Sequence, residues 1–239
     1  MPTFEGLKAE YARLWVSMEI RPDRISAVDK IAHKLLVNKP TYLAAQTKTG
    51  VPWFVIAAWH NRESGADFST QLAQGDPLDQ VSRNEPSGRG PFSSWQDGAY
   101  DALVTLKHLD TIREWTPERI CYETERYNGF GHRNKGINAP YLWSFTNHYT
   151  KGKYVKDHVY DPEFVDKQCG AIPIIKRIME LDGIKTKKPV DTGVIIAAGG
   201  GAVATAAAGA GGNPWVIGFI IAAVVITFGL FIYYRRKNG

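Results

Sequence analysis

Over the first fifty residues, apolar positions recur every three or four residues, which is the spacing of one face of a helix. Two runs follow this spacing: Tyr11, Leu14, Trp15 and Met18, then Ile25, Val28, Ile31 and Leu35. Pro22 separates the two runs, and a third helical segment extends from Lys39-Pro40-Thr41 to Gly50. We therefore expect three helices before residue 51.

The next segment differs because its apolar residues cover every side of a helix. From Val51 to Trp59 the only residue that is not a standard apolar one is Pro52, which suits a helix's first turn. A helix that is apolar all round is buried. This pattern predicts a buried helix that carries Glu63 out of the core, with Trp59 one turn back on the same face. A carboxyl group against an indole is poorly solvated, and the neutral form that this favours is the one a general acid needs. The alternative is a solvated glutamate at a helix end.

Residues 64–93 are expected to form a long loop. Glycines and prolines interrupt this stretch throughout, at Gly65, Gly75, Pro77, Pro86, Gly88, Gly90 and Pro91. They leave no room for a regular element. Loops of this length inside a compact domain are usually functional.

Beyond the loop, local signals predict further helices. The starts are a capping-box spacing at Ser94 and Asp97, Thr116-Pro117 for a helix that ends at Asn128-Gly129, Pro140 for a short aromatic helix, and Asp161-Pro162 for a last pair broken at Gly170 and Pro173. No segment shows convincing alternation of period two. We therefore expect residues 1–182 to form a mainly α domain.

After Asp182 the composition changes abruptly. Residues 183–192 form a basic linker, and residues 193–211 are a Gly/Ala-rich stretch without charge that is either a marginal membrane segment or a low-complexity linker. Residues 215–234 are an uncharged apolar run, long enough as a helix to cross the hydrocarbon core of a bilayer. Trp215 at one end and Tyr233 and Tyr234 at the other are typical interfacial anchors. The sequence thus predicts a C-terminal transmembrane helix in contact with lipid.

The charges around these segments predict their orientation. Positive residues that flank membrane spans stay in the cytoplasm, so Arg235-Arg236-Lys237 places the C-terminus on the cytoplasmic side of a bacterial inner membrane. If residues 215–234 alone span, residues 1–182 face the cell wall. If residues 193–211 also insert, the two segments form a hairpin and residues 1–182 lie in the cytoplasm. The lack of positive charge in the turn at 212–214 favours the hairpin, whereas the Gly and Ala content of the first segment opposes it.

Composition narrows the functional classes. The aromatic content of 12% is too high for a disordered chain. A net charge of +5 suits acidic partners such as cell wall, lipid headgroups or nucleic acid. No Lys/Arg-rich run with interleaved aromatic residues is present, so we expect no nucleic-acid partner. Cys121 and Cys169 lie far apart, and the N-terminus lacks an apolar export segment, so we expect two thiols rather than a disulfide.

Glu63-Ser64 at a helix end, followed by Tyr127-Asn128-Gly129, resembles the goose-type lysozyme and lytic transglycosylase group. The wider sequence pattern is similar to that of bacterial and phage proteins of the lysozyme family. The segments that carry this second resemblance are Asn61–Gly65, Gln74–Leu78, Gly88–Phe92 and Pro140–Ser144, in this order. The resemblance covers about residues 1–182 and implies a lysozyme-like helical fold.

In that group the glutamate protonates the glycosidic oxygen and the Tyr-Asn segment lines the saccharide cleft. The resemblance therefore implies a peptidoglycan glycosidase with Glu63 as general acid and with Tyr127 and Asn128 on the substrate. Ser64 and Asp67, beside the acid, are further candidate substrate contacts. All four have structural alternatives, namely helix termination, capping or a solvated surface position.

Hydrolysis with inversion also needs a base, at a carboxyl separation of about 6.5–9.5 Å from the acid. The long loop offers Asp67, Asp76 and Glu85, and we favour Asp76 because Gly75 and Pro77 constrain it. Its alternative role is to hold a turn. Lytic transglycosylases have no second carboxylate and let a substrate hydroxyl attack, so hydrolysis and transglycosylation both stay open.

Two other functions are alternatives to a glycosidase. A metal-dependent cell-wall amidase or peptidase would need a ligand set, and the chain offers His60, His132, His148 and His158. None of these lies in a strong zinc pattern such as His-Glu-x-x-His, so we expect no metal and no cofactor. A membrane protein whose lysozyme-like domain only binds wall polymers is the second alternative.

Overall fold

The computed structural model describes residues 1–156 and 158–186. Both expected membrane segments, 193–211 and 215–234, and most of the basic linker lie outside the described residues. Within those residues, no helix is long and apolar enough to cross a membrane.

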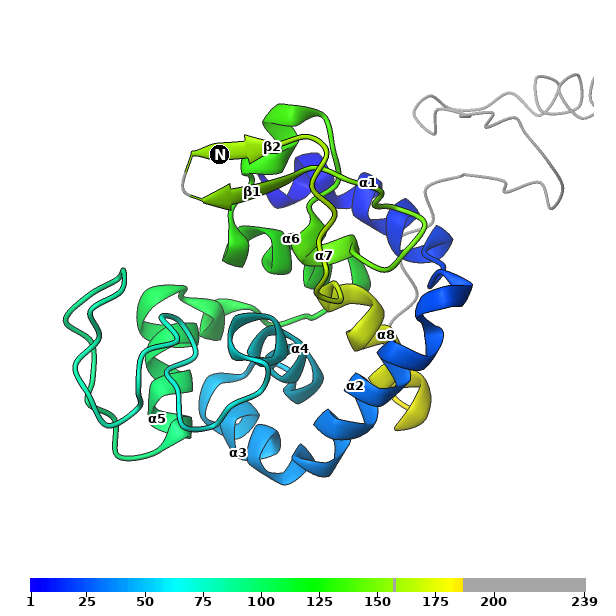
Figure 1. The fold of residues 1–239 in the computed structure, drawn as a ribbon. Coiled ribbons are helices and arrows are strands. Elements are labelled where there is room, and N and C mark those ends of the chain that lie inside the picture. Colours follow the sequence, from blue (N-terminus) through cyan, green and yellow to red (C-terminus); the bar gives the residue numbers. More distant parts are fainter. Residues whose placement is uncertain (157, 187–239) are drawn as a thin grey trace, which may run out of the picture. The chain divides into compact units, whose positions relative to one another are not determined.

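The described part of the chain is mainly helical, as expected (Figure 1). The main helices are α1 (Phe4–Ser17), α2 (Ile25–Val37), α3 (Lys39–Thr49), α4 (Trp53–Ser64), α5 (Trp95–Tyr100), α6 (Pro117–Asn128), α7 (Pro140–Trp143) and α8 (Ala171–Leu181). Shorter helical turns are η1 (Pro22–Arg24), the π-helix η2 (Asp101–Leu106), η3 (Leu109–Thr111) and η4 (Gly131–Lys135).

Three main helices precede residue 51, as the sequence predicts, and the third begins at Lys39 and is ended by Gly50 as expected. The Thr3 hydroxyl caps α1 by accepting a hydrogen bond from the amide of Gly6 at 3.2 Å. Pro40 lies in the first turn of α3, where a backbone N–H would have no partner within the helix and proline lacks one. Gly50 ends α3 in the left-handed conformation (φ 74°), which costs glycine little.

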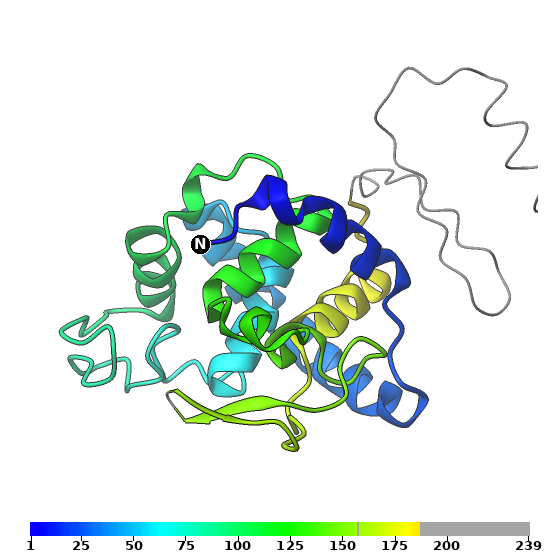
Figure 2. The ribbon, with the colours of Figure 1, turned by 90° about the horizontal axis from the view of Figure 1, so that it is seen from above.

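Helices far apart in the sequence lie side by side, α1 against α6 and α2 against α8 (Figure 2). The Tyr11 hydroxyl of α1 donates to the Glu125 carboxylate of α6, and both side chains are buried. α4 packs against α3 and α8, and every residue from Trp53 to His60 is buried. The prediction of a buried helix leading to Glu63 is confirmed.

The segment between α4 and α5 is a long loop, as predicted. It packs on the helix that follows it, because a Cβ at Gly98 of α5 would lie 3.3 Å from side-chain atoms of both Leu78 and Phe92. The predicted cap of α5 is also present, since the amide of Asp97 donates to the Ser94 hydroxyl at 3.2 Å.

The segment after α7 contradicts the sequence prediction. An antiparallel hairpin of β1 (Lys153–Lys156) and β2 (Val159–Asp161) ends at Asp161, and no helix begins at Asp161-Pro162. A single helix, α8, follows from Ala171, with Pro173 in its first turn. The prediction of two helices was wrong because Pro162 and Pro173 are also compatible with a loop and a first helical turn. Strands of three and four residues are too short to show alternation.

Both cysteines are free thiols. Cys121 of α6 and Cys169 before α8 are almost completely buried. The expectation of two thiols is confirmed.

Candidate active site

Glu63 lies in the last turn of the buried helix α4. The helix ends at Gly65, which adopts the left-handed conformation (φ 65°) and donates its amide to the carbonyl of Asn61 at 3.1 Å. Because the helix stops directly after Glu63, this side chain reaches solvent while most of the helix before it stays in the core.

The carboxyl group of Glu63 is held by Tyr141 of α7, whose hydroxyl donates to Oε1 at 2.7 Å. Burial among surrounding protein atoms raises the pKa of Glu63, while the Tyr141 hydrogen bond and the charges of Arg62 and Lys107 oppose this rise. The side chain is nevertheless exposed to solvent. The raised pKa agrees with the expectation for a general acid.

The sequence predicted that the indole of Trp59 lies against the carboxyl group of Glu63, and the structure shows the indole packed on Tyr127. The indole and the Tyr127 ring are stacked, with centroids 4.8 Å apart and an interplanar angle of 22°. The indole N–H donates to the Thr124 hydroxyl at 3.0 Å. Burial raises the pKa values of the Tyr127 and Tyr141 phenols, and the charge of Glu63 raises them further.

Tyr127 and Asn128 form the end of α6, beside the acid. The Tyr127 hydroxyl donates to the carbonyl of Leu72 at 3.4 Å and so connects α6 to the long loop. Lys107 donates to the Tyr127 carbonyl at 3.2 Å and lies 5.1 Å from the centre of its ring. Asn128 is exposed and lines a pocket next to Glu63. Both residues therefore combine helix termination with a position at the site.

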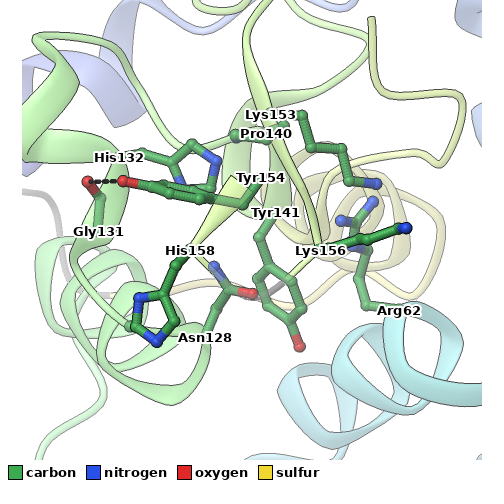
Figure 3. Close-up of a pocket in the computed structure, with 11 residues that line it drawn as sticks. Arg62, Asn128, Gly131, His132, Pro140, Tyr141, Lys153, Tyr154, Lys156 and His158 are labelled. Atoms are coloured by element: carbon green, nitrogen blue, oxygen red, sulfur yellow. Dashed lines mark hydrogen bonds between the residues drawn. The ribbon is translucent and has the colours of Figure 1, made fainter. Parts of the chain in front are cut away.

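The pocket has a volume of about 290 Å³ and lies between the end of α6, α7 and the β-hairpin. Its wall includes Asn128, Tyr141 and Arg62, and four residues of the hairpin region also line it (Figure 3). These are Lys153, Tyr154, Lys156 and His158, which come from a segment where we expected no strands. Figure 3 shows the side chains of Lys153 and Lys156 together with that of Arg62 on one side of the pocket.

A buried ion pair fixes this side of the pocket. Arg62 donates to Asp166 at 3.0 Å, and Lys153 contacts the other oxygen of Asp166 at 2.8 Å. The Arg62 guanidinium also lies 4.8 Å from the ring centre of Tyr141. Burial raises the pKa of Asp166, but Arg62, Lys153 and the amide of Gln168 lower it more, so the net shift is downward. Sequence reasoning missed Arg62 and Asp166 because their separation of 104 residues leaves no local signal.

Ser64 and Asp67 make local contacts. The Ser64 hydroxyl donates to the carbonyl of His60 at 3.3 Å. One oxygen of Asp67 accepts from the amide and the hydroxyl of Ser69, at 2.9 and 2.7 Å, and these bonds lower the pKa of Asp67. Asp67 is therefore ionised at neutral pH. Their roles as substrate contacts stay predictions.

Asp76, the favoured base, organises the long loop. One of its oxygens accepts from the amides of Arg83 and Asn84, at 3.0 and 2.9 Å, and the other from the Asn84 side chain at 3.1 Å. The carboxylate of Glu85 similarly accepts from Ser87. These contacts match the alternative role of holding a turn, and the role of Asp76 as a base stays a prediction.

His60 supports the end of α4 from inside. It is fully buried and lies 3.0 Å from the Tyr42 hydroxyl through Nδ1 and 3.1 Å from the carbonyl of Asp67 through Nε2. Burial lowers its pKa to about 4, so His60 is neutral near pH 7. Across residues 1–156 and 158–186, no three His, Cys, Asp or Glu side chains are grouped so that they could hold a metal ion.

Known protein families, curated proteins and solved structures were compared with the chain, and none of them matches it. The site is therefore interpreted from its own geometry and from the sequence motifs.

Proposed function

We propose that this chain is a glycosidase that cleaves the glycan strand of bacterial peptidoglycan, with Glu63 as the general acid. The observation that carries the proposal is the carboxyl group of Glu63, whose pKa is raised by burial and whose Oε1 accepts a hydrogen bond from Tyr141. Cleavage of a glycosidic bond needs such an acid to protonate the leaving oxygen.

In the proposed reaction, neutral Glu63 gives its proton to the glycosidic oxygen as the bond to the sugar carbon breaks. The carboxylate that remains accepts the hydrogen bond from Tyr141, and the positive charges of Arg62 and Lys107 act on it. These interactions favour the charged form and so strengthen as the proton leaves. They therefore stabilise the transition state more than the ground state.

The second step needs a nucleophile, and two routes fit the site. In the hydrolytic route, a loop carboxylate such as Asp76 activates water. In the transglycosylase route, a hydroxyl of the substrate attacks and no second carboxylate is needed. The transglycosylase route is favoured because the carboxylates of Asp67, Asp76 and Glu85 already accept hydrogen bonds from nearby residues.

Replacing Glu63 tests the acid. Glu63→Gln keeps the shape of the side chain but has no proton to donate, so the cleavage of purified cell wall should fall by about a hundredfold or more. Glu163→Gln is a matched control, because Glu163 is exposed and pairs with Lys151 away from the pocket. Near-normal cleavage by the Glu63→Gln protein with a native circular dichroism spectrum would overturn the assignment. Loss of cleavage on adding a chelator would instead favour the metal-dependent amidase.

Mass spectrometry of the products separates the two routes. Hydrolysis leaves a reducing end, whereas transglycosylation leaves a 1,6-anhydro end that is lighter by one water. Products with new amino groups and intact glycan would identify an amidase or peptidase. An intact wall with the protein bound to it would identify the non-catalytic alternative.

We further propose that the enzyme is anchored in a bacterial inner membrane, the host's if the gene belongs to a phage, through residues 215–234. The support is the sequence pattern alone: an uncharged apolar run with aromatic ends and a basic flank.

A further inference from the structure

The pocket beside Glu63 carries more positive than negative charge. Arg62, Lys153 and Lys156 line it, and the carboxylate that faces this group, Asp166, is shared by Arg62 and Lys153. Among the described residues, three positive charges thus face one negative charge at this wall. A cavity that is partly closed off from water concentrates such a field on any anion that enters it.

The pocket shares a residue with the acid. Tyr141 lines the pocket, and its hydroxyl contacts Glu63. Asn128 lines the pocket from the end of α6. In Figure 3 the phenol of Tyr141 points toward the bottom of the view, and the Arg62 guanidinium lies 4.8 Å from the centre of its ring. A substrate bound at Glu63 would therefore place a neighbouring substituent within reach of the cations.

We propose that this pocket binds a carboxylate on the substrate, borne by the acidic substituent of the sugar next to the cleaved bond. This inference rests on the proposed function, because the glycan of peptidoglycan carries lactyl and peptide arms that end in carboxylates. The volume of about 290 Å³ accommodates a short arm rather than a further sugar chain. The carboxylate contacts Lys156 in the positive field of Arg62 and Lys153, and it makes the enzyme prefer acidic glycan over neutral glycan.

A binding experiment with two forms of one ligand tests the preference. The probe is a peptidoglycan disaccharide with its carboxylates free, compared with the same disaccharide after conversion of the carboxylates to methylamides. Binding to the full-length chain carrying Glu63→Gln, purified in detergent, is measured by calorimetry, so that no turnover occurs. The free-acid form should bind about fivefold or more tightly than the amide form, the effect of one favourable ion pair.

Two lysine variants locate the effect. Lys156→Gln should abolish most of the preference for the acid form, while Lys151→Gln should leave it intact. Lys151 is the matched control because it precedes the same hairpin, is exposed and pairs with Glu163 rather than lining the pocket. Unchanged melting temperatures confirm that both variants fold.

The outcomes separate this inference from the proposed function. Equal binding of both ligand forms, or a preference that survives Lys156→Gln, would overturn the carboxylate site even if the wild-type chain cleaves wall. A preference that depends on Lys156 supports the site, and wild-type product analysis then decides independently whether the chain is a glycosidase.

Discussion

At Glu63, the environment that suits the acid for catalysis also acts on stability. Its pKa in the folded protein is raised, so the contribution of this carboxyl group to stability is present at low pH and is lost as pH rises through that pKa. Glutamine cannot ionise. We therefore expect Glu63→Gln to match the wild type in melting temperature near pH 4 and to exceed it near pH 8. A variant less stable than the wild type at both pH values would contradict this account of the carboxyl group.

The hydroxyl of Tyr141 adjusts the pKa of the acid. Its hydrogen bond lowers the pKa of Glu63, so Tyr141→Phe should raise that pKa further. The acid must be protonated to act, and activity falls as pH rises through its pKa. The alkaline limb of the kcat/KM profile should thus move to higher pH in the variant, while the maximum rate falls because the new carboxylate loses a donor. A lower rate with an unmoved alkaline limb would reduce Tyr141 to a packing role.

The substitution Asp76→Asn distinguishes a role in holding the loop from a role as the catalytic base. An asparagine keeps one acceptor oxygen and loses the charge, so the contacts with Arg83, Asn84 or both weaken. With a loss of about 1 kcal/mol, the melting temperature should fall by about 2–4 °C in a domain of this size. Asp67→Asn, in which the replaced carboxylate accepts hydrogen bonds from Ser69, is the comparison. If Asp76→Asn keeps the wild-type melting temperature but cripples turnover, Asp76 is the base of an inverting hydrolase.

At the scale of elements, Asp166 connects the hairpin to the central helix. It pairs with Lys153 of β1 and with Arg62 of α4, and it is almost completely buried. Asp166→Ala leaves two cations without their partner, which costs about 3–5 kcal/mol in comparable buried pairs. Chemical denaturation should show this loss, and the control Glu163→Ala, in the exposed pair with Lys151, should change stability by less than about 1 kcal/mol.

The same pair predicts acid sensitivity. The pKa of Asp166 is lowered in the folded protein, so its stabilising contribution is present above the pKa of an unfolded aspartate and is lost as pH falls toward the folded value. Stability of the wild type should therefore decrease below about pH 4, and this decrease should be smaller in Asp166→Asn.

Helices whose bounds and burial are set by residues close together in the chain could be predicted from the sequence. Proline starts and glycine ends located α3 and α4, and the all-round apolar pattern located the buried helix that leads to Glu63. The hairpin could not be predicted, because a pairing of three to four residues carries too few positions for a period to show.

The candidate site was predictable only where it is local. Glu63, Tyr127 and Asn128 stand in short motifs at helix ends. The contact of Tyr141 with Glu63 joins residues 78 positions apart, so no local pattern indicates it. Tyr141 lies in Pro140–Ser144, one of the motifs that carry the family resemblance. Membership of this motif was the signal in the sequence that could have identified Tyr141 as a site residue. For the cationic pocket no such signal existed, because the tertiary fold brings α4, η4, α7 and the hairpin together.

At the scale of the whole molecule, the proposed membrane anchor allows two arrangements of residues 1–182, inside or outside the membrane. We expect the hairpin arrangement, in which residues 193–211 and 215–234 both span. A cysteine introduced at 212–214 should then react with an impermeant reagent added to intact spheroplasts, and one introduced on the surface of residues 1–182 should not. Reaction of the domain would instead establish a single span with the enzyme on the outer side.

The native thiols do not disturb this measurement. Cys121 and Cys169 are buried, and burial raises the pKa of Cys121 well above its usual value and that of Cys169 to about 12. Labelling reagents react with exposed thiolates. The unmodified chain should therefore give no signal, and strong labelling of it would mean that the domain opens under the conditions of the assay.

The two buried thiols also bear on where the fold can survive. Because neither cysteine forms a disulfide, the described domain has no covalent cross-link for a reducing cytoplasm to break. Because both are shielded and remain as thiols, an oxidising periplasm has little to attack. The state of the two cysteines is therefore compatible with either side of the proposed membrane anchor.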